Sequence, residues 1–99
     1  MSTDIQIEEK IKIKATEPKR WKVILLNDDS TPMEFVISLL ISIFKHTHET
    51  SQEIMLQVHE TGSGVAGLYS FEIAEAKAVE STQQARTAGY PLQIKLEEE

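Results

Sequence analysis

The chain passes from a strand to a helix within residues 21–35, which read WKVILLNDDSTPMEF. Residues 21–26 are an almost unbroken apolar run, rich in β-branched and aromatic side chains, and this pattern predicts a strand that is covered on at least one face. Asn27-Asp28-Asp29-Ser30 follow, and each of these side chains can hydrogen-bond to nearby backbone, which favours a turn. We therefore expect a buried strand that runs directly into a polar turn.

The turn leads into the first of three predicted helices. Thr31 is the expected N-cap, with Pro32 at the first helical position and Glu34 completing a capping box. Apolar residues at helical spacing continue to about His46, so this helix is apolar over much of its girth. The other two helices are predicted over residues 50–61, opened by a Thr50-x-x-Glu53 capping box, and over residues 71–88, capped by Ser70.

Two further strands complete the predicted order. Residues 65–70 form a short strand, and residues 91–97 alternate between apolar and polar side chains, which predicts a strand with one face in water. The order β-α-α-β-α-β is typical of a small α+β domain with a sheet packed against helices. We expect a flexible N-terminal arm over residues 1–20 and a folded domain over residues 21–99, with a weak edge strand as the alternative for the arm.

Charge is unevenly distributed along the chain. The 99 residues have a formal net charge of −6, from 10 basic and 16 acidic side chains. Residues 1–20 carry five basic and four acidic side chains, whereas residues 21–99 carry five basic and twelve acidic ones. The acidic folded part would repel nucleic-acid phosphates and attract a cationic or amine-bearing partner. A nucleic-acid role is therefore not expected, although an acidic surface also simply serves solubility.

The residues needed for most catalytic and metal chemistry are missing from this chain. There is no cysteine, which excludes disulfides, thiolate zinc sites and a cysteine nucleophile. His46-x-His48 would need at least one more ligand to hold a metal, and a surface loop is the simpler interpretation. Neither a phosphate-binding glycine loop nor a nucleophile elbow is present. We therefore predict no enzymatic activity, no catalytic residue, no metal and no cofactor.

The turn after the first strand is the best candidate for a binding site. Asn27 offers both donors and acceptors, and Asp28 and Asp29 offer anionic acceptors, a set that suits an ammonium group. The junction of a buried strand with a helix is also a common place for a site in layered α/β structures. Taken alone, the same cluster is more typical of an ordinary turn, so this alternative stays open.

A second group of residues offers an apolar wall for such a site. Met55, Val58 and His59 lie at i, i+3 and i+4 of a predicted helix and so share one face. The neutral imidazole of His59 can accept a hydrogen bond from an amine, although a histidine in this pattern is also typical of a core residue. Met33 and Met55 would line an adaptable apolar cavity. Together these residues predict a pocket for an amine beside an apolar side chain.

Most of the predicted folded part is similar to a known family. The run KVILLNDDSTPMEFVISLL, residues 22–40, closely resembles the ClpS family, the N-end rule adaptors of the Clp protease. The resemblance continues through IMLQVHETGSGVAG (54–67), FEIAEAKA (71–78) and YPLQIKLE (90–97). It covers residues 21–97 without an evident gap, and NDD-x-TPMEFV followed by ML-x-VH is a long and specific pattern.

The resemblance implies a fold, a function and partners. The fold is three antiparallel strands packed against three helices. The function is that of a non-enzymatic adaptor for N-degron substrates, whose first residue is bulky and hydrophobic (Phe, Tyr, Trp or Leu). The adaptor delivers them to the N-terminal domain of the AAA+ unfoldase ClpA, which feeds the ClpAP protease. We expect a monomer that binds neither nucleic acid nor membrane.

The family pattern assigns roles to three sets of residues. Asn27, Asp28 and His59 match ligands of the substrate α-amino group, and Asp29 adjoins the same loop. Glu72 and Lys77 match positions implicated in docking on the unfoldase. The pocket for the first side chain is matched by Leu25, Thr31, Met33, Val36, Met55, Val58 and Leu92, with Met33 as the gate that rejects β-branched residues.

The sequence departs from the family pattern in three places. Ser30 stands where an aromatic residue, often Tyr, is common, which would weaken a contact with the unfoldase because aromatic residues tend to anchor interfaces. Residues 62–67 lack the Lys and Cys often seen there. Residues 1–20 show no detailed match, and family arms act as a flexible handle for the unfoldase.

Two other functions were compared with the adaptor hypothesis. The first is a different docking module on a ribosomal-stalk-like α+β fold. Asn27, Asp28, Met33 and His59 argue against it, because a docking face needs no ammonium pocket. The second is an amine-using hydrolase with His59 and Asp28 as acid–base groups. The absence of a recognisable nucleophile or set of metal ligands in the sequence argues against it.

The sequence shows no targeting or membrane signal. No apolar run approaches the ~20 residues of a membrane span. The N-terminus is charged and lacks the apolar core of a secretory signal, and no plastid transit peptide is evident. We therefore expect the protein in the bacterial cytoplasm.

Overall fold

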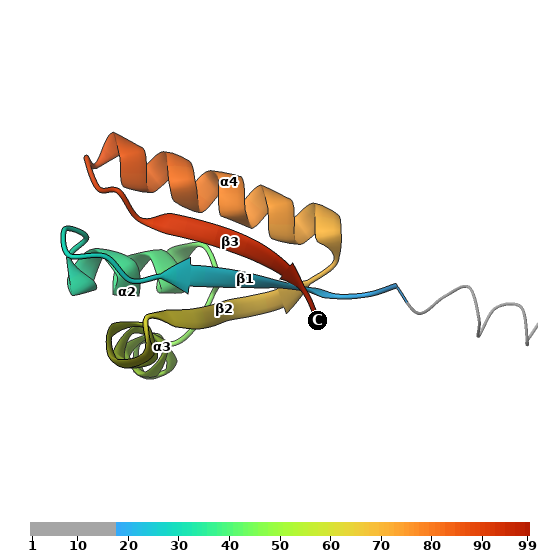
Figure 1. Ribbon diagram of the computed structural model, residues 1–99, viewed down its shortest axis with the longest axis horizontal. Coiled ribbons are helices and arrows are strands. Elements are labelled where there is room, and N and C mark those ends of the chain that lie inside the picture. The colour runs from blue at the N-terminus through green and yellow to red at the C-terminus, as the bar shows by residue number, and fades with distance from the viewer. Residues whose placement is uncertain (1–17) are drawn as a thin grey trace, which may run out of the picture.

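The computed structural model describes residues 18–99, and Trp21–Leu26 (β1) is the central strand of its sheet. The other elements are Met33–Ser42 (α2), His48–Thr61 (α3), Ser63–Tyr69 (β2), Phe71–Thr87 (α4) and Gln93–Glu98 (β3). β1 pairs antiparallel with both neighbours, in the order β2-β1-β3. Figure 1 shows α4 alongside β3 and α3 beside the start of β2. The predicted α+β fold, with its three antiparallel strands and three helices, is confirmed.

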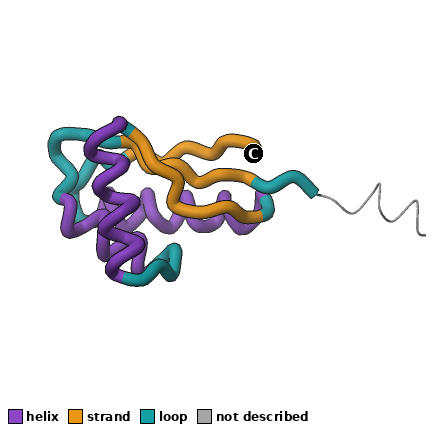
Figure 2. The backbone as a smooth tube through the Cα atoms, turned by 90° about the horizontal axis from the view of Figure 1, so that it is seen from below, coloured by secondary structure: helices purple, strands orange, loops and turns teal. Residues whose placement is uncertain are grey.

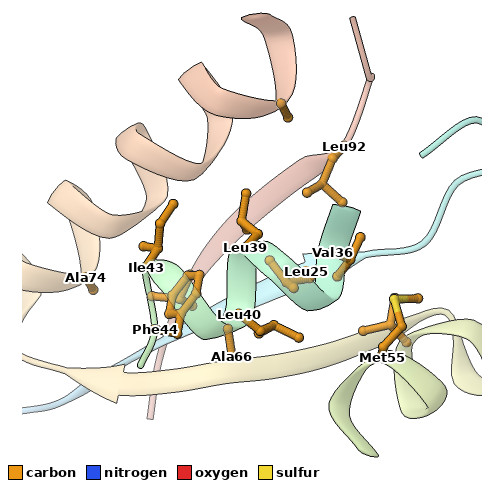
Figure 3. Close-up of a cluster of buried hydrophobic side chains, with 13 residues drawn as sticks. Leu25, Val36, Leu39, Leu40, Ile43, Phe44, Met55, Ala66, Ala74 and Leu92 are labelled. Carbon is orange, nitrogen blue, oxygen red and sulfur yellow. The ribbon is translucent and has the colours of Figure 1, made fainter. Parts of the chain in front are cut away.

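One face of the sheet carries the hydrophobic core. Val23 and Leu25 of β1 are fully buried, and they lie opposite Leu96 and Ile94 of β3. In Figure 2 one helix runs along the strands while the others cross at one end of the sheet. Figure 3 shows the buried side chains that pack over β1 and β2. They come from the three helices (Val36, Leu39, Leu40, Met55 and Ala74), from the residues just after α2 (Ile43 and Phe44) and from the segment before β3 (Leu92). The first helix was predicted to be apolar around much of its circumference, and the structure shows that this reflects deep burial.

The start of α2 differs from its prediction. The helix begins at Met33 with Pro32 as N-cap, and no side chain caps it. Instead, the Thr31 hydroxyl donates to Asp28 Oδ2 at 2.8 Å. The predicted capping box at Thr31 is wrong, because the helix begins one residue later and the Pro32 carbonyl accepts from the backbone N–H groups of Phe35 and Val36.

The loop between α2 and α3 also differs from its prediction. α2 ends at Ser42 instead of near His46, and Lys45 has a left-handed φ of 61°. α3 begins at His48, and its cap is Thr47, whose Oγ1 accepts from the Thr50 backbone N–H at 3.1 Å. The cap predicted at Thr50 is therefore wrong by about one helical turn, because Thr47 offers the same chemistry earlier in the chain.

His46 connects this loop to the sheet. The register of β1 with β2 shifts between Val23 and Ile24, which leaves Ala66 without a directly paired residue on β1. Nε2 of His46 contacts the carbonyl oxygen of Ala66 at 2.5 Å, so this bulge carbonyl has a partner. His46 lies in the loop between α2 and α3, as the sequence predicts, but its side chain is half-buried because it contacts the bulge of β2.

The predicted arm over residues 1–20 falls outside the described residues except for its last three. Of these, Lys19 pairs with Glu98 at 3.5 Å and Arg20 with Glu99 at 3.0 Å. The Glu99 backbone N–H also donates to the Arg20 carbonyl at 2.9 Å. Residues 19 and 20 therefore continue alongside the end of β3, and the division between arm and domain stays a prediction.

Candidate functional site

The Asp28 carboxylate organises the turn between β1 and α2. Its Oδ1 accepts hydrogen bonds from the backbone N–H of Ser30 at 2.8 Å and of Thr31 at 2.7 Å. Its Oδ2 accepts from the Thr31 hydroxyl. Three bonds to one side chain hold the loop in a single shape, which places the residues on either side of Asp28.

Asp28 is charged at neutral pH. Partial burial raises the pKa of this carboxyl, but the hydrogen bonds from Thr31 and Ser30 and the nearby Arg86 guanidinium outweigh it. The net result is a pKa below the ordinary value of 3.8. The turn therefore carries a permanent negative charge under physiological conditions.

Asn27 lies beside the C-terminal end of α3. Its backbone N–H donates to the Gly62 carbonyl at 2.9 Å, and the Gly62 N–H donates to the Val58 carbonyl at 2.9 Å. Gly62 ends the helix with a φ of 94°, a left-handed conformation that glycine adopts without strain. Because the C-terminal end of a helix carries partial negative charge, this neighbour adds to the attraction of Asp28 for a cation.

A small hollow lies against this turn. Its free volume is about 10 Å³, room for roughly one water molecule. The turn contributes polar atoms, and the helices contribute an apolar wall. The lining residues are Leu26, Asn27, Asp28, Thr31, Val36, Met55, Val58 and Leu92. An apolar concavity with a few polar groups from one loop is the usual composition of a ligand site.

Gly64 allows α3 to approach the sheet closely enough to form this wall. A Cβ at Gly64 would lie 2.7 Å from Cγ2 of Val58, closer than such carbons approach. A side chain at this position would therefore force Val58 or the helix that carries it to shift. Val58 and, one turn earlier, Met55 are both buried, and both face the hollow as a result.

The structure brings some predicted site residues together and leaves others apart. Asn27, Asp28, Thr31, Val36, Met55, Val58 and Leu92 all line the hollow, whereas Leu25, Asp29, Met33 and His59 do not. Leu25 is fully buried in the core. Met33 is 45% exposed in the first turn of α2, and Asp29 and His59 are exposed. His59 lies in the last turn of α3, one turn beyond Met55.

The two residues predicted for docking differ in their surroundings. Glu72 is exposed in the first turn of α4. Lys77 is half-buried, and its Nζ donates to the Ile43 carbonyl at 2.7 Å. The same ammonium lies 5.9 Å from the ring centre of Phe44 and 5.3 Å from that of Tyr69, within the range of cation–π contacts. Lys77 thus has partners inside its own domain.

Two residues at or near the site, Leu26 and Arg86, were not predicted from the sequence. Leu26 lines the hollow, and the only available signal was its position immediately before the turn. Arg86, near the end of α4, donates from Nη1 to the carbonyls of Tyr90 at 2.9 Å and Leu92 at 2.8 Å. Nothing in the local pattern marks Arg86, because its partners come from the segment that returns to the sheet.

The described residues hold neither a metal cluster nor a membrane-spanning helix. Among residues 18–99, no group of three or more His, Asp and Glu side chains is placed to hold a metal ion. Within the same range, each helix is too short or too polar to cross a bilayer.

Comparisons with known proteins assign the chain to a family. The family model described as "ATP-dependent Clp protease adaptor protein ClpS" matches residues 16–95. A relative with that description from Bdellovibrio bacteriovorus is 54% identical over 86 residues, which cover 87% of this chain and 75% of the relative. Another, from Oleidesulfovibrio alaskensis, is 45% identical over 95 residues, which cover 96% of this chain and 88% of the relative.

A solved structure shares both fold and sequence with this chain. The structure of Agrobacterium tumefaciens ClpS2 bound to L-phenylalaninamide matches with a TM-score of 0.81 and 42% identity. The match covers 84% of this chain and 100% of that one. Sequence and fold agree over most of both chains, and the protein therefore belongs to the ClpS family of adaptors of the ATP-dependent Clp protease.

Proposed function

We propose that this protein binds the free N-terminus of substrates whose first residue is Phe, Tyr, Trp or Leu and delivers them to the unfoldase ClpA for degradation by ClpAP. The observation that carries the proposal is the charged Asp28 turn placed directly against an apolar hollow. The similar ClpS2 is described as bound to L-phenylalaninamide. That molecule has a free α-amine, a benzyl side chain and an amide in place of the next peptide bond, so it mimics an N-terminal phenylalanine.

The α-ammonium group of the substrate is held by the turn. An ammonium has three donors and a positive charge, which suits the Asn27 side-chain oxygen and the charge of Asp28. Because three bonds already occupy the Asp28 carboxylate, Asp28 acts mainly by charge and through water. Asp29 adds negative charge to the loop, and His59 acts as a further acceptor from the last turn of α3.

The side chain of the first residue occupies the hollow, which must widen to receive it. A space for one water molecule does not hold a benzyl ring. Met55 is the wall residue with the greatest freedom to move, because methionine has three rotatable side-chain bonds and no branch. Met33 stands exposed at the start of α2 and acts as the gate, while Leu25 belongs to the buried core beneath the pocket.

Delivery needs a surface for the unfoldase and involves no chemistry by the adaptor itself. Glu72 is exposed on α4, and Ile73 beside it is 51% exposed, so this turn offers both charge and apolar area for docking. Lys77 contributes to docking by holding α4 against Ile43. The protein acts as a non-catalytic monomer in the bacterial cytoplasm, with residues 1–20 as the handle for ClpA.

Fluorescence anisotropy with short labelled peptides tests the binding step. A Phe-initiated peptide should bind, whereas its N-acetylated form and a Glu-initiated peptide should bind far more weakly. Asn27→Ala should weaken binding by roughly 10- to 150-fold, the equivalent of one hydrogen bond to a charged group. Gln52→Ala, an exposed change elsewhere on α3, is the matched control and should bind as the parent does. Equal affinity for the Phe- and Glu-initiated peptides would refute the proposal.

Calorimetric titration tests the gate. Met33→Ala should admit Ile- and Val-initiated peptides, because the shorter side chain removes the steric barrier to β-branched residues. Met33→Leu, of similar size, should keep the discrimination of the parent. If the alanine variant gains nothing for an Ile-initiated peptide, Met33 is not the gate.

Degradation by the reconstituted ClpAP protease tests delivery. Removal of residues 1–17 should leave peptide affinity unchanged and abolish degradation of a Leu-initiated substrate. Glu72→Ala should slow degradation at limiting adaptor without changing peptide affinity. Full-rate degradation with the truncated protein would exclude a handle role for these residues.

A further inference from the structure

A groove lies between α4 and β3, apart from the hollow at the turn. Its volume is about 350 Å³, and its walls are one stripe of α4 and two apolar residues of β3. The lining residues are Glu75, Ala78, Val79, Thr82, Gln83, Ile94 and Leu96. Val79 is 50% exposed, and Ile94 and Leu96 are half-buried at the margin of the core. The groove is therefore a mainly apolar surface that residues 18–99 leave uncovered.

The groove follows the free edge of the sheet. Within residues 18–99, β3 pairs only with β1, so its outer edge has no neighbouring strand. Ile94 and Leu96 face the core side of the sheet, because the β1 residues opposite them are buried. A strand added beyond β3 would therefore place every second side chain in the groove, in line with Ile94 and Leu96. An unpaired edge of this kind is where an extended chain can add to a sheet.

The chain contains a segment that matches this surface. Residues 10–14 read KIKIK, in which Ile11 and Ile13 alternate with three lysines. The two isoleucines have the same i, i+2 spacing as Ile94 and Leu96, so in a strand both would point to one side. Apolar and polar residues that alternate in this way are typical of a strand with one buried face.

The start of the described chain puts this segment within reach of the groove. The Arg20 carbonyl accepts from the Glu99 N–H at 2.9 Å, so the chain enters β1 beside the end of β3, and Figure 1 shows the C-terminus there. Ile13 is seven residues before Arg20, a span of up to about 23 Å when extended. Leu96 is three strand residues back from Glu99, about 10 Å. The segment can therefore cross the end of β3 and lie parallel to it.

Charge favours the same contact. Residues 10–14 carry three positive charges and no negative one. Glu75 lines the groove, is exposed, and forms no ion pair within residues 18–99. Residues 93–99 carry three acidic side chains and one basic side chain. The groove is therefore bordered by negative charge where the segment brings positive charge.

We propose that residues 10–14 add to the free edge of β3 as a fourth strand, with Ile11 and Ile13 in the groove against Val79. The docking does not depend on the proposed function, because it needs neither a peptide nor an unfoldase. A docked segment is withheld from a partner that has to grip the N-terminal residues. In the proposed function, docking and delivery would therefore compete for the same stretch of chain.

Disulfide trapping in the full-length chain tests the contact. The chain has no cysteine, so a pair of introduced thiols reports only its own contact. The test pair is Ile13→Cys with Val79→Cys, and the control pair is Ile13→Cys with Val65→Cys on the other edge strand, β2. Both valines are exposed, and Val65 and Lys95 both lie opposite Ile24, so the two edges are matched in distance from the start of β1. Because a disulfide requires Cα atoms within ~7 Å, the test pair should oxidise at least about fivefold faster than the control pair.

Hydrogen exchange in the chain without introduced thiols gives a second measurement. Docking gives hydrogen-bond partners to the outward backbone amides of β3, residues 93–98. If about two thirds of the molecules are docked, these amides should exchange about threefold more slowly than in the undocked chain. The double variant Ile11→Ser, Ile13→Ser should lose this protection. Val79→Asp should lose it as well, because it places a charge in the groove.

Matched variants exclude a general effect of the substitutions. Ile5→Ser with Ile7→Ser removes two isoleucines outside the segment, and Leu56→Asp adds a charge at a similarly exposed position on α3. Both should keep the protection of β3. Equal oxidation of the two cysteine pairs, or unchanged exchange in the double variant, would overturn the proposal. Failure of the parent to bind a Phe-initiated peptide would overturn the proposed function and leave the docking of the segment standing.

Discussion

Two basic side chains of α4, Lys77 and Arg86, donate hydrogen bonds to backbone carbonyls of other segments but differ in their surroundings. In the first half of the helix, Lys77 donates to the Ile43 carbonyl, just past the end of α2. Near its end, Arg86 donates to two carbonyls in the segment that leads into β3. Each of the two cations thus ties α4 to the backbone of a neighbouring segment, and Figure 1 shows α4 running alongside the sheet.

The surroundings of the two cations differ. Lys77 is half-buried beside the rings of Phe44 and Tyr69, so its charge is used within the domain. Arg86 is exposed, and only one of its nitrogens is occupied by the two bonds. The difference teaches that two basic residues of one helix can make the same kind of bond while one charge is enclosed by aromatic rings and the other faces solvent.

Leu92→Ala should have the largest effect on stability, because it removes the side chain that the Arg86 end of α4 holds in place. Leu92 is 1% exposed, and truncation of a buried leucine costs about 2–5 kcal/mol. Urea denaturation gives the free energy of unfolding directly. Leu68→Ala, on a leucine that is 38% exposed, is the control and should cost much less. A loss below ~1 kcal/mol for Leu92→Ala would show that this end of the domain is not packed as described.

Lys77→Met should lower the free energy of unfolding by about 1.5–3 kcal/mol, the usual range for a hydrogen bond to a charged group. Methionine keeps most of the aliphatic stem, so the loss reports the ammonium and its partners. Peptide affinity should stay at the parent value, because Lys77 does not line the hollow. Arg86→Met should lower the free energy of unfolding less than Lys77→Met, because Arg86 is exposed. Equal losses of stability in the two variants would contradict the described difference in their surroundings.

Asp28→Ala should lower the free energy of unfolding at pH 7 by about 0.5–2 kcal/mol, as for the loss of a polar cap at the start of a helix. Folding lowers the pKa of Asp28, so its stabilisation is fully present above the ordinary value of 3.8 and is lost as the pH falls through the lowered pKa. The difference between parent and variant should therefore narrow below pH 3.8. Urea denaturation from pH 7 to pH 2 measures this, and a difference that stays constant would contradict the described hydrogen bonds.

Ser81→Ala should have the smallest effect, with a gain of up to about 1 kcal/mol. Ser81 lies on α4 between Lys77 and Arg86, it is fully buried, and its hydroxyl has no partner within residues 18–99. Removal of an unsatisfied buried hydroxyl relieves its desolvation cost, and alanine is the better helix former. Thermal unfolding should show a raised Tm. A clear destabilisation would mean that the hydroxyl has a partner after all.

The sequence predicted the elements because their signals are local. The apolar run of β1, the helical spacing in α2 and the alternation in β3 each depend on residues a few positions apart, and all three elements are present. Turn chemistry was less predictable, because several side chains compete for the same backbone groups. Thr31 and Thr50 were each expected to cap a helix, but Asp28 engages Thr31 and Thr47 takes the cap of α3.

The candidate site was predictable where it depends on one turn and one helix face. Asn27 and Asp28 lie together because they are adjacent in the sequence. Met55 and Val58 lie together because they are about one helical turn apart. All four residues line the hollow. Leu25 was assigned to the pocket, yet the neighbouring Leu26 lines it. Successive strand residues point to opposite faces, so Leu25 and Leu26 have different surroundings, and the role of Leu25 in the pocket stays a prediction.

By itself, the sequence determined which segments become strands and helices, where a negatively charged turn follows a buried strand, and to which family the chain is similar. Only the tertiary structure decided the partners of Lys77, Arg86 and His46, because each bonds to a carbonyl of a different element. The pattern of apolar side chains along an element indicates which of its faces is buried. Every residue has a backbone carbonyl, so the sequence does not indicate which carbonyl a side chain will bond to. The packing of the elements around α4 therefore decides which cation is enclosed and which is exposed.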